Sequence, residues 1–83
     1  MPRFIERPLE QVGLGPGGRP LFLRWRGRSW RVTRTADVWK DVGCWWEEEG
    51  EKVFYRLEID GGRLFEVYLD RRTGKWFLYR VYD

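Results

Sequence analysis

The 83-residue chain has no histidine, one cysteine and one serine. Without histidine it lacks the commonest general base and the commonest metal ligand of proteins. Cys44 alone can form neither an internal disulfide nor a zinc site, and Ser29 has no base for a catalytic triad. Glu58, Glu66 and Asp70 are expected to be ion-pair partners and not catalytic carboxylates. We therefore expect no enzymatic activity, no cofactor and no bound metal.

Long apolar runs are also absent. No stretch approaches the ~20 apolar residues that span a bilayer, and the N-terminal segment is charged and interrupted by Pro2 and Pro8, unlike a signal peptide. These absences predict a cytoplasmic protein with no membrane partner. In a reducing compartment a lone cysteine such as Cys44 is expected to be a small buried side chain.

Aromatic side chains are abundant instead. Six Trp, five Phe and four Tyr make up 18% of the chain. Aromatic residues favour strands and bury a large area each, which suits a domain that buries roughly 60–65% of its unfolded surface. The composition predicts one small β domain with a core built from rings.

The net charge of +3 hides an asymmetry along the chain. Residues 1–40 carry nine Lys or Arg against three Asp or Glu, whereas residues 41–83 carry seven against ten. Thirteen of the sixteen cations are arginine, whose guanidinium makes bidentate contacts with phosphate or carboxylate and stacks on aromatic rings. Arginines in this number are typical either of a binding surface or of a solvated one, and both interpretations stay open here.

The N-terminal half predicts an arm, a loop and a hairpin. Residues 3–12 predict an edge strand or arm, and the glycine-rich residues 13–18 predict a plain connector, because they lack the ending of a phosphate-binding loop. Residues 20–26 and 29–33 predict two strands joined by a type II′ turn at Gly27-Arg28. Trp25 would then face Trp30, and Leu23 would face Val32. The other face would carry Phe22 and the basic side chains of Arg24, Arg26 and Arg31, and Arg28 would lie at the tip.

The middle of the chain is less regular. Val38-Trp39 can continue the second strand, and only residues 39–49 leave room for a short helical turn. Gly43-Cys44-Trp45-Trp46 is an apolar patch. Residues 47–51 form an acidic loop that we expect to be solvated, since they lack the ligand spacing of a calcium loop.

The C-terminal part predicts a three-stranded meander. Residues 53–59 and 63–69 predict two strands joined by Asp60-Gly61-Gly62, and residues 76–82 predict a third strand after a turn that places Gly74 in a left-handed position. The first loop predicts the following cross-strand pairs: Leu57 with Phe65, Tyr55 with Val67, Val53 with Leu69, Arg56 with Glu66 and Phe54 with Tyr68.

Together these elements predict an all-β domain over residues 1–83, with five or six antiparallel strands in a strongly coiled sheet or a small half-open barrel. Its parts are an N-terminal strand or arm with the glycine-rich loop (1–19), a basic hairpin (20–40), an acidic loop (41–51) and the meander (52–83).

The meander is predicted to be apolar on both faces, although a small domain has only one interior. One set contains Val53, Tyr55, Leu57, Phe65, Val67, Leu69, Trp76 and Leu78, and the other contains Phe54, Leu64, Tyr68, Phe77, Tyr79 and Val81. The chain itself or a partner must cover the second face.

Several strings of the chain form a recognisable pattern: Arg24-Trp25-Arg26-Gly27-Arg28, Trp45-Trp46, Asp60-Gly61-Gly62, Phe65-Glu66-Val67-Tyr68-Leu69-Asp70-Arg71 and Trp76-Phe77-Leu78-Tyr79. Over residues 3–83 the chain resembles a small bacterial family of unknown function and the C-terminal region of ImuB, the inactive Y-family polymerase relative of the bacterial mutasome. The resemblance implies an accessory or adaptor role in DNA damage tolerance. The chain lacks the polymerase-like body of ImuB, so the resemblance implies no polymerase or clamp-binding property.

Two hypotheses for function follow. The first is a non-enzymatic interaction module, an accessory protein in bacterial DNA repair or translesion synthesis, which binds a protein partner or a second copy through Phe54, Tyr68, Phe77, Tyr79, Trp45 and Trp46. The alternative is a small nucleic-acid-binding protein that uses an arginine ribbon with aromatic stacking, through Phe22, Arg24, Arg26, Arg28 and Arg31.

Overall fold

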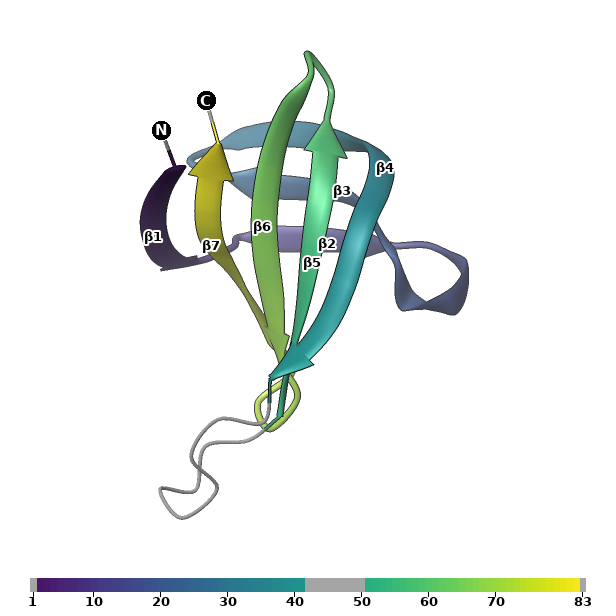
Figure 1. Ribbon diagram of the computed structural model, residues 1–83, viewed down its shortest axis with the longest axis vertical. Coiled ribbons are helices and arrows are strands. Elements are labelled where there is room, and N and C mark those ends of the chain that lie inside the picture. Colours follow the sequence, from purple (N-terminus) through teal and green to yellow (C-terminus); the bar gives the residue numbers. More distant parts are fainter. Residues whose placement is uncertain (1, 42–50, 83) are drawn as a thin grey trace.

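The structure, a computed structural model, describes residues 2–41 and 51–82, and the side chains of residues 7–40 and 51–82. Seven strands lie within these ranges: β1 (Pro2–Pro8), β2 (Gln11–Leu14), β3 (Pro20–Trp25), β4 (Arg28–Asp41), β5 (Lys52–Ile59), β6 (Arg63–Asp70) and β7 (Lys75–Tyr82) (Figure 1). One 3-10 turn, Pro16–Gly18, is the sole helical segment described. The all-β prediction is confirmed, but five or six strands was wrong, since the described residues form seven.

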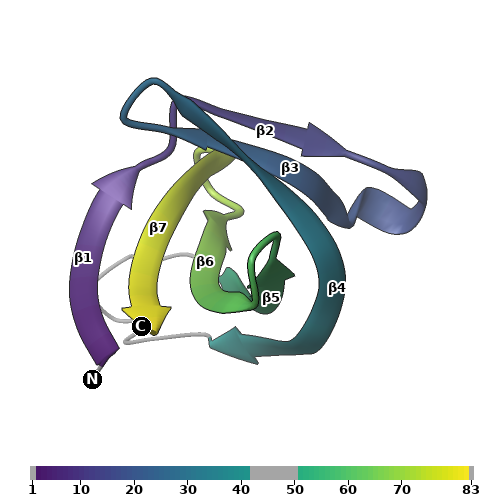
Figure 2. The same cartoon turned by 90° about the horizontal axis from the view of Figure 1, so that it is seen from above.

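The strands form one antiparallel sheet in the order β1-β7-β6-β5-β4-β3-β2. β4 is shared, because its first residues pair with β3 and those from Val32 onward pair with β5. Its pairing with β5 shifts register between Val32 and Arg34 and again between Thr35 and Asp37. Such bulges bend a strand and increase its twist. The sheet therefore curls into a half-barrel, and β2 and β3 run across one side of it, behind the meander strands in the view of Figure 1 (Figure 2).

The chain turns a corner at Leu9 and Glu10, which separates β1 from β2. The Leu9 amide donates to the Trp76 carbonyl oxygen on β7 at 3.0 Å, and the Glu10 amide donates to the Arg24 carbonyl oxygen on β3 at 2.9 Å. The predicted arm over residues 3–12 is thus two strands that stand at opposite ends of the sheet order. β2 also includes Gly13 and Leu14, which we had expected in the loop.

The core lies on the concave side of the meander, where β3 covers it. Leu23 of β3 packs there with five fully buried residues of β5, β6 and β7: Leu57, Ile59, Phe65, Val67 and Leu78. Burial of each such side chain contributes roughly 1.5–3 kcal/mol. The meander face that carries Leu57 and Phe65 is therefore the interior, and Trp25, Trp30 and Trp76 pack around its margin.

The predicted register of the first hairpin of the meander, β5–β6, is confirmed. All five cross-strand pairs expected between residues 53–59 and 63–69 are present in the β5–β6 ladder. Gly61, Gly62 and Gly74 have positive φ angles of 94°, 82° and 74° in the two turns, which glycine adopts without strain. In the second turn the Gly74 amide donates to the Asp70 carbonyl oxygen, and the Asp70 carboxylate accepts from the Arg72 amide.

A bulge in β7 corrects the predicted position of Val81. Glu66 pairs with Arg80 but Val67 pairs with Leu78, so Tyr79 is an extra residue in β7. One inserted residue exchanges the two faces of a strand beyond it. Val81 consequently pairs with Phe65 and packs against the core, not on the outer face where we had expected it.

The register of the β3–β4 hairpin also differs from the prediction. Trp25 pairs with Arg28, and Leu23 pairs with Trp30, so the two-residue turn is Arg26-Gly27. Both turn residues have positive φ, 54° and 71°, as a type I′ turn requires. The predicted partners were therefore two residues off. Leu23 still shares the core-facing side with Trp30, but Arg28 lies in β4 and not at the tip.

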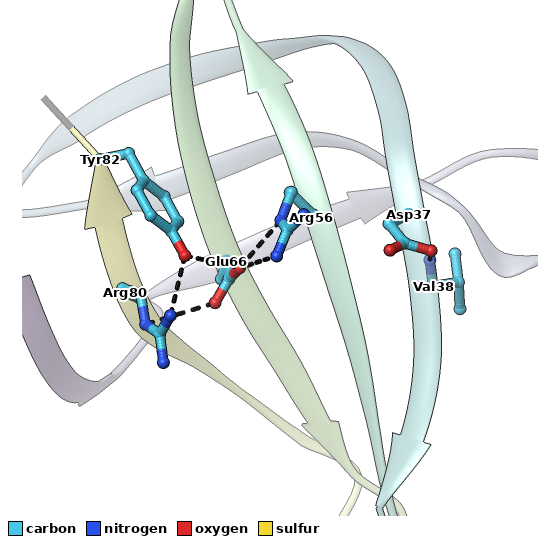
Figure 3. A network of polar contacts seen from close by, with 6 residues as sticks. All are labelled: Asp37, Val38, Arg56, Glu66, Arg80 and Tyr82. Carbon is cyan, nitrogen blue, oxygen red and sulfur yellow. Dashed lines mark hydrogen bonds and ion pairs between the residues drawn. The ribbon is translucent and has the colours of Figure 1, made fainter. Parts of the chain in front are cut away.

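The β4 strand continues through Val38 and Trp39, as predicted. Val38 lies in the part of β4 that does not pair with β3, and its side chain is 48% exposed. The Val38 amide donates to the Asp37 carboxylate at 2.9 Å (Figure 3). The predictions for Cys44, for Trp45 and Trp46, and for the acidic run 47–50 lie outside the described residues.

Candidate functional site

The outward side of strands β2, β3 and the first part of β4, here called the ribbon face, carries an exposed aromatic ring between arginines. Phe22 pairs with Gly13 on one side and with Arg31 on the other, and the next row places Arg24 between Gln11 and Ser29. A β-carbon at Gly13 would lie 1.9 Å from Cε1 of Phe22, so the ring occupies the space that glycine leaves open. Phe22 remains 37% exposed there. The ring thus lies against one strand and faces solvent.

Positive charge dominates this part of the chain. Residues 11–36 contain six arginines and neither aspartate nor glutamate. Arg24 pairs with Glu10, with 3.5 Å between Nε and Oε2, and Arg34 pairs with Glu58 across the β4–β5 ladder. Within the described part of the chain, Arg31 has no acidic partner within 4.0 Å. The ribbon face therefore presents uncompensated positive charge beside Phe22.

The structure places the five predicted ribbon residues in three positions: on the ribbon face, in the turn and on the core-facing side. Phe22, Arg24 and Arg31 share the ribbon face. Arg26 lies in the turn, with its guanidinium 4.6 Å from the ring centroid of Trp25. Arg28 lies on the opposite, core-facing side, 4.0 Å from the ring of Trp30. The prediction that Arg24, Arg26 and Arg31 share one face, with Arg28 at the tip, was therefore only partly right.

Arg63 is a further residue of this region that the sequence interpretation missed. Its guanidinium lies 5.5 Å from the Trp30 ring centroid, on which Arg28 also stacks. The Asp60 amide donates to the Arg31 carbonyl oxygen at 2.9 Å and so joins the β5–β6 turn to β4. This contact between distant segments brings Arg63 to Trp30, and no local pattern in the sequence indicates it.

The four described side chains of the predicted partner-binding face form one aromatic cluster, together with Trp39 from β4. Trp39 stacks on Phe54 with centroids 5.4 Å apart, and Phe77 stacks on Tyr68 at 5.0 Å. Tyr79 meets both Phe54 and Tyr68 edge to face. Phe54 and Tyr68 are each only 7% exposed. The cluster thus covers much of its own apolar surface, and Trp39 was not in the predicted set.

A buried carboxylate continues this outer face. Glu66, which is 1% exposed, accepts from Arg56 Nε at 2.9 Å and from the Tyr82 hydroxyl at 3.2 Å (Figure 3). Arg80 Nε lies 3.5 Å from the other carboxylate oxygen, and Arg80 Nη1 donates to the Tyr82 hydroxyl. The hydrogen bond to Glu66 raises the pKa of Arg56, and the one to Tyr82 raises that of Arg80. Both arginines therefore stay charged beside Glu66.

The described residues carry few other candidate sites. Among residues 2–41 and 51–82, no cluster of three His, Cys, Asp or Glu side chains could hold a metal ion. The same ranges include no helix with the length and apolarity that a membrane crossing requires. Glu58 and Glu66 are ion-pair partners, as predicted.

Comparison with known proteins identifies the family. No curated protein and no solved structure matches the chain. A family model described as a domain of unknown function, DUF6504, matches residues 1–83. The chain, with its exposed ribbon face and self-covered aromatic cluster, therefore belongs to the DUF6504 family.

Proposed function

We propose that this protein is a non-enzymatic module that binds single-stranded nucleic acid through its ribbon face. The observation that carries the proposal is the exposed ring of Phe22, which lies over Gly13 and beside Arg24 and Arg31. Binders of single strands combine an aromatic platform for a base with cations that track the backbone. The ribbon face has both parts on neighbouring strands.

Charge supports nucleic acid as the ligand of this face. Phosphate contacts supply most of the sequence-independent affinity, and arginine suits them because its fork of donors matches phosphate oxygens. The six arginines of residues 11–36 stand in a segment without acidic residues. Only Arg24 and Arg34 of this segment pair with carboxylates of the described residues.

The biological setting is part of the same proposal. The likeness to the C-terminal region of ImuB suggests an accessory protein of bacterial DNA repair or translesion synthesis in the cytoplasm. Single strands are exposed during such synthesis, so a small module that holds them fits this setting.

The test is titration of fluorescently labelled oligothymidylate and of a duplex of the same length, followed by anisotropy at several salt concentrations. We expect the single strand to bind and its affinity to fall with salt. Phe22→Leu should weaken binding about five-fold or more, because stacking contributes about 1–3 kcal/mol per base. Gly13→Val should weaken it similarly, since the new side chain displaces the ring.

Phe77→Leu is the matched control, because it removes a ring from the aromatic cluster and leaves the ribbon face intact. Its affinity for the oligonucleotide should equal that of the wild type. Absence of binding at low salt, or binding that salt does not alter, would rule out the proposal.

A second candidate function is protein binding through the aromatic cluster. The observation in its favour is that Trp39, Phe77 and Tyr79 remain partly exposed around the buried rings of Phe54 and Tyr68. Partly exposed aromatic side chains are enriched at protein interfaces. The ribbon face is the stronger candidate, because the rings of the cluster already cover one another.

A further inference from the structure

We infer that Arg28 and Arg63, which both stack on Trp30, bind phosphate groups of the strand whose base stacks on Phe22. This inference rests on the proposed function and extends its surface from the ribbon face to the other side of β4. The pair is called the Trp30 clamp here. Arg28 is the first residue of β4 and Arg63 the first residue of β6, so one arginine follows the β3–β4 turn and the other follows the β5–β6 turn.

Both guanidiniums lie over the indole of Trp30. Cζ of Arg28 lies 4.0 Å from the ring centroid and Cζ of Arg63 lies 5.5 Å from it. The ring itself is held against Phe65 of the core at a centroid distance of 5.2 Å. Stacking uses the π face of a guanidinium and leaves its N–H donors at the edge unused. Two arginines are thus oriented in advance with their donors available.

Charge at the clamp favours an anion. Within the described part of the chain, neither Arg28 nor Arg63 has an acidic partner within 4.0 Å, and both side chains are exposed. Two cations on one ring repel each other, and an anionic group relieves that repulsion. Arginine forks recognise phosphate through paired hydrogen bonds, so phosphate groups are the anions that this geometry fits.

The clamp lies close to the ribbon face along one strand. Arg31, which pairs with Phe22, immediately follows Trp30 in β4, and its carbonyl oxygen holds the amide of Asp60 in the β5–β6 turn. A strand with one base on Phe22 can therefore pass Arg31 and reach the clamp over the edge of β4. A strand of about ten nucleotides is within the site sizes of small β domains.

The experiment measures the salt dependence of oligothymidylate binding in Arg28→Gln and Arg63→Gln. Each variant should reduce the slope of log affinity against log salt by about one phosphate contact, whereas Phe22→Leu should lower affinity and keep the slope. Lys75→Gln is the matched control, since it removes one exposed positive charge beside the β6–β7 turn, at the other end of the meander (Figure 1). It should keep the wild-type slope.

A second measurement does not need a nucleic acid. Inorganic tripolyphosphate should shift the indole N–H resonance of Trp30, assigned by its loss in Trp30→Phe, because both guanidiniums that would hold it lie over the ring of that indole. It should leave the ring resonances of Phe22 in place.

If the oligonucleotide binds but both arginine variants keep the wild-type slope, the clamp is wrong and the proposed function stands. If tripolyphosphate shifts Trp30 but no oligonucleotide binds, the proposed function is wrong and the clamp remains a phosphate site.

Discussion

At the scale of single residues, Glu66 is the buried charged side chain of the described residues, and its contacts should contribute most to stability. It is 1% exposed and receives donors from Arg56 and Tyr82, with Arg80 at 3.5 Å. Glu66→Gln keeps the shape but removes the negative charge that holds both arginines. We expect the free energy of unfolding to fall by about 2 kcal/mol, because hydrogen bonds to charged groups contribute about 1.5–3 kcal/mol each and both arginines keep some access to water.

Chemical denaturation of Glu66→Gln beside Glu58→Gln measures this effect. Glu58 also faces an arginine from a neighbouring strand, but Arg34 is 68% exposed, so its loss should cost less than about 1 kcal/mol. Equal losses in the two variants would show that burial of Glu66 does not strengthen its contacts.

Residue by residue, the sequence predicted neighbours within the meander but not contacts from outside it. Phe54 and Tyr68 were paired correctly because both belong to one hairpin. Trp39 and Arg63 were missed, since each reaches its ring partner through the pairing of β4 with segments far along the chain. Cross-strand rules describe pairs once the strands are known to be adjacent, and long-range adjacency is set by the whole sheet.

At the scale of elements, Glu10 connects the β1–β2 corner to the β3–β4 turn. Its Oε1 accepts from the Gly27 amide at 2.8 Å, and its Oε2 lies 3.5 Å from Nε of Arg24. Glu10→Gln should lower the free energy of unfolding by about 1 kcal/mol or less, because the contacts are exposed. Under the proposed function the same change should raise affinity for oligothymidylate several-fold at low salt, since Glu10 is the one carboxylate among the described side chains that pairs with the ribbon face.

The opposite signs of these two effects make the Glu10 variant informative. Denaturation and anisotropy on the same preparation measure them together. A loss of affinity that follows the loss of stability would mean that Glu10 only supports the hairpin.

Turns explain which elements were predictable. The loop Asp60-Gly61-Gly62 fixes the β5–β6 register locally, because two glycines with positive φ admit few alternatives. The other hairpin uses Arg26, with φ at 54°, as its first turn residue. A non-glycine residue in this conformation is uncommon, and Gly27 is held by Glu10 from outside the hairpin. The bulge at Tyr79 was hidden for a similar reason, as no glycine marks it.

At the scale of the whole molecule, we expect a monomer in solution. The aromatic cluster would gain little by dimerisation, since Phe54 and Tyr68 are already only 7% exposed. Sedimentation velocity over a range of concentrations measures this, with Phe77→Ser as a variant of the cluster. A mass that rises with concentration in the wild type but not in Phe77→Ser would instead support the protein-binding function of the cluster.

The sequence did not indicate which face of the meander is the interior. Two apolar faces on one meander were visible in the sequence, and the interior proved to be the face with Leu57 and Phe65. The second face is covered by rings from β4 and β7 and by the Glu66 contacts, which involve side chains moved there by the bulge in β7. Neither the ring contacts nor the Glu66 contacts on this face could be derived before the curvature of the sheet was known.

The carboxylate of Asp37 has a consequence for handling the protein at high concentration. It accepts a hydrogen bond from the amide of Val38 on β4, next to two bulges. Among the described residues β3 pairs with β4 only as far as Arg31, so β4 has a free edge beyond it. A free edge with an amide bonded to its own side chain and with bulges in its line offers a poor template for a strand of another molecule. Concentrated samples should therefore resist fibril growth from this side of the sheet, and Asp37→Ala should make them more prone to bind amyloid dyes.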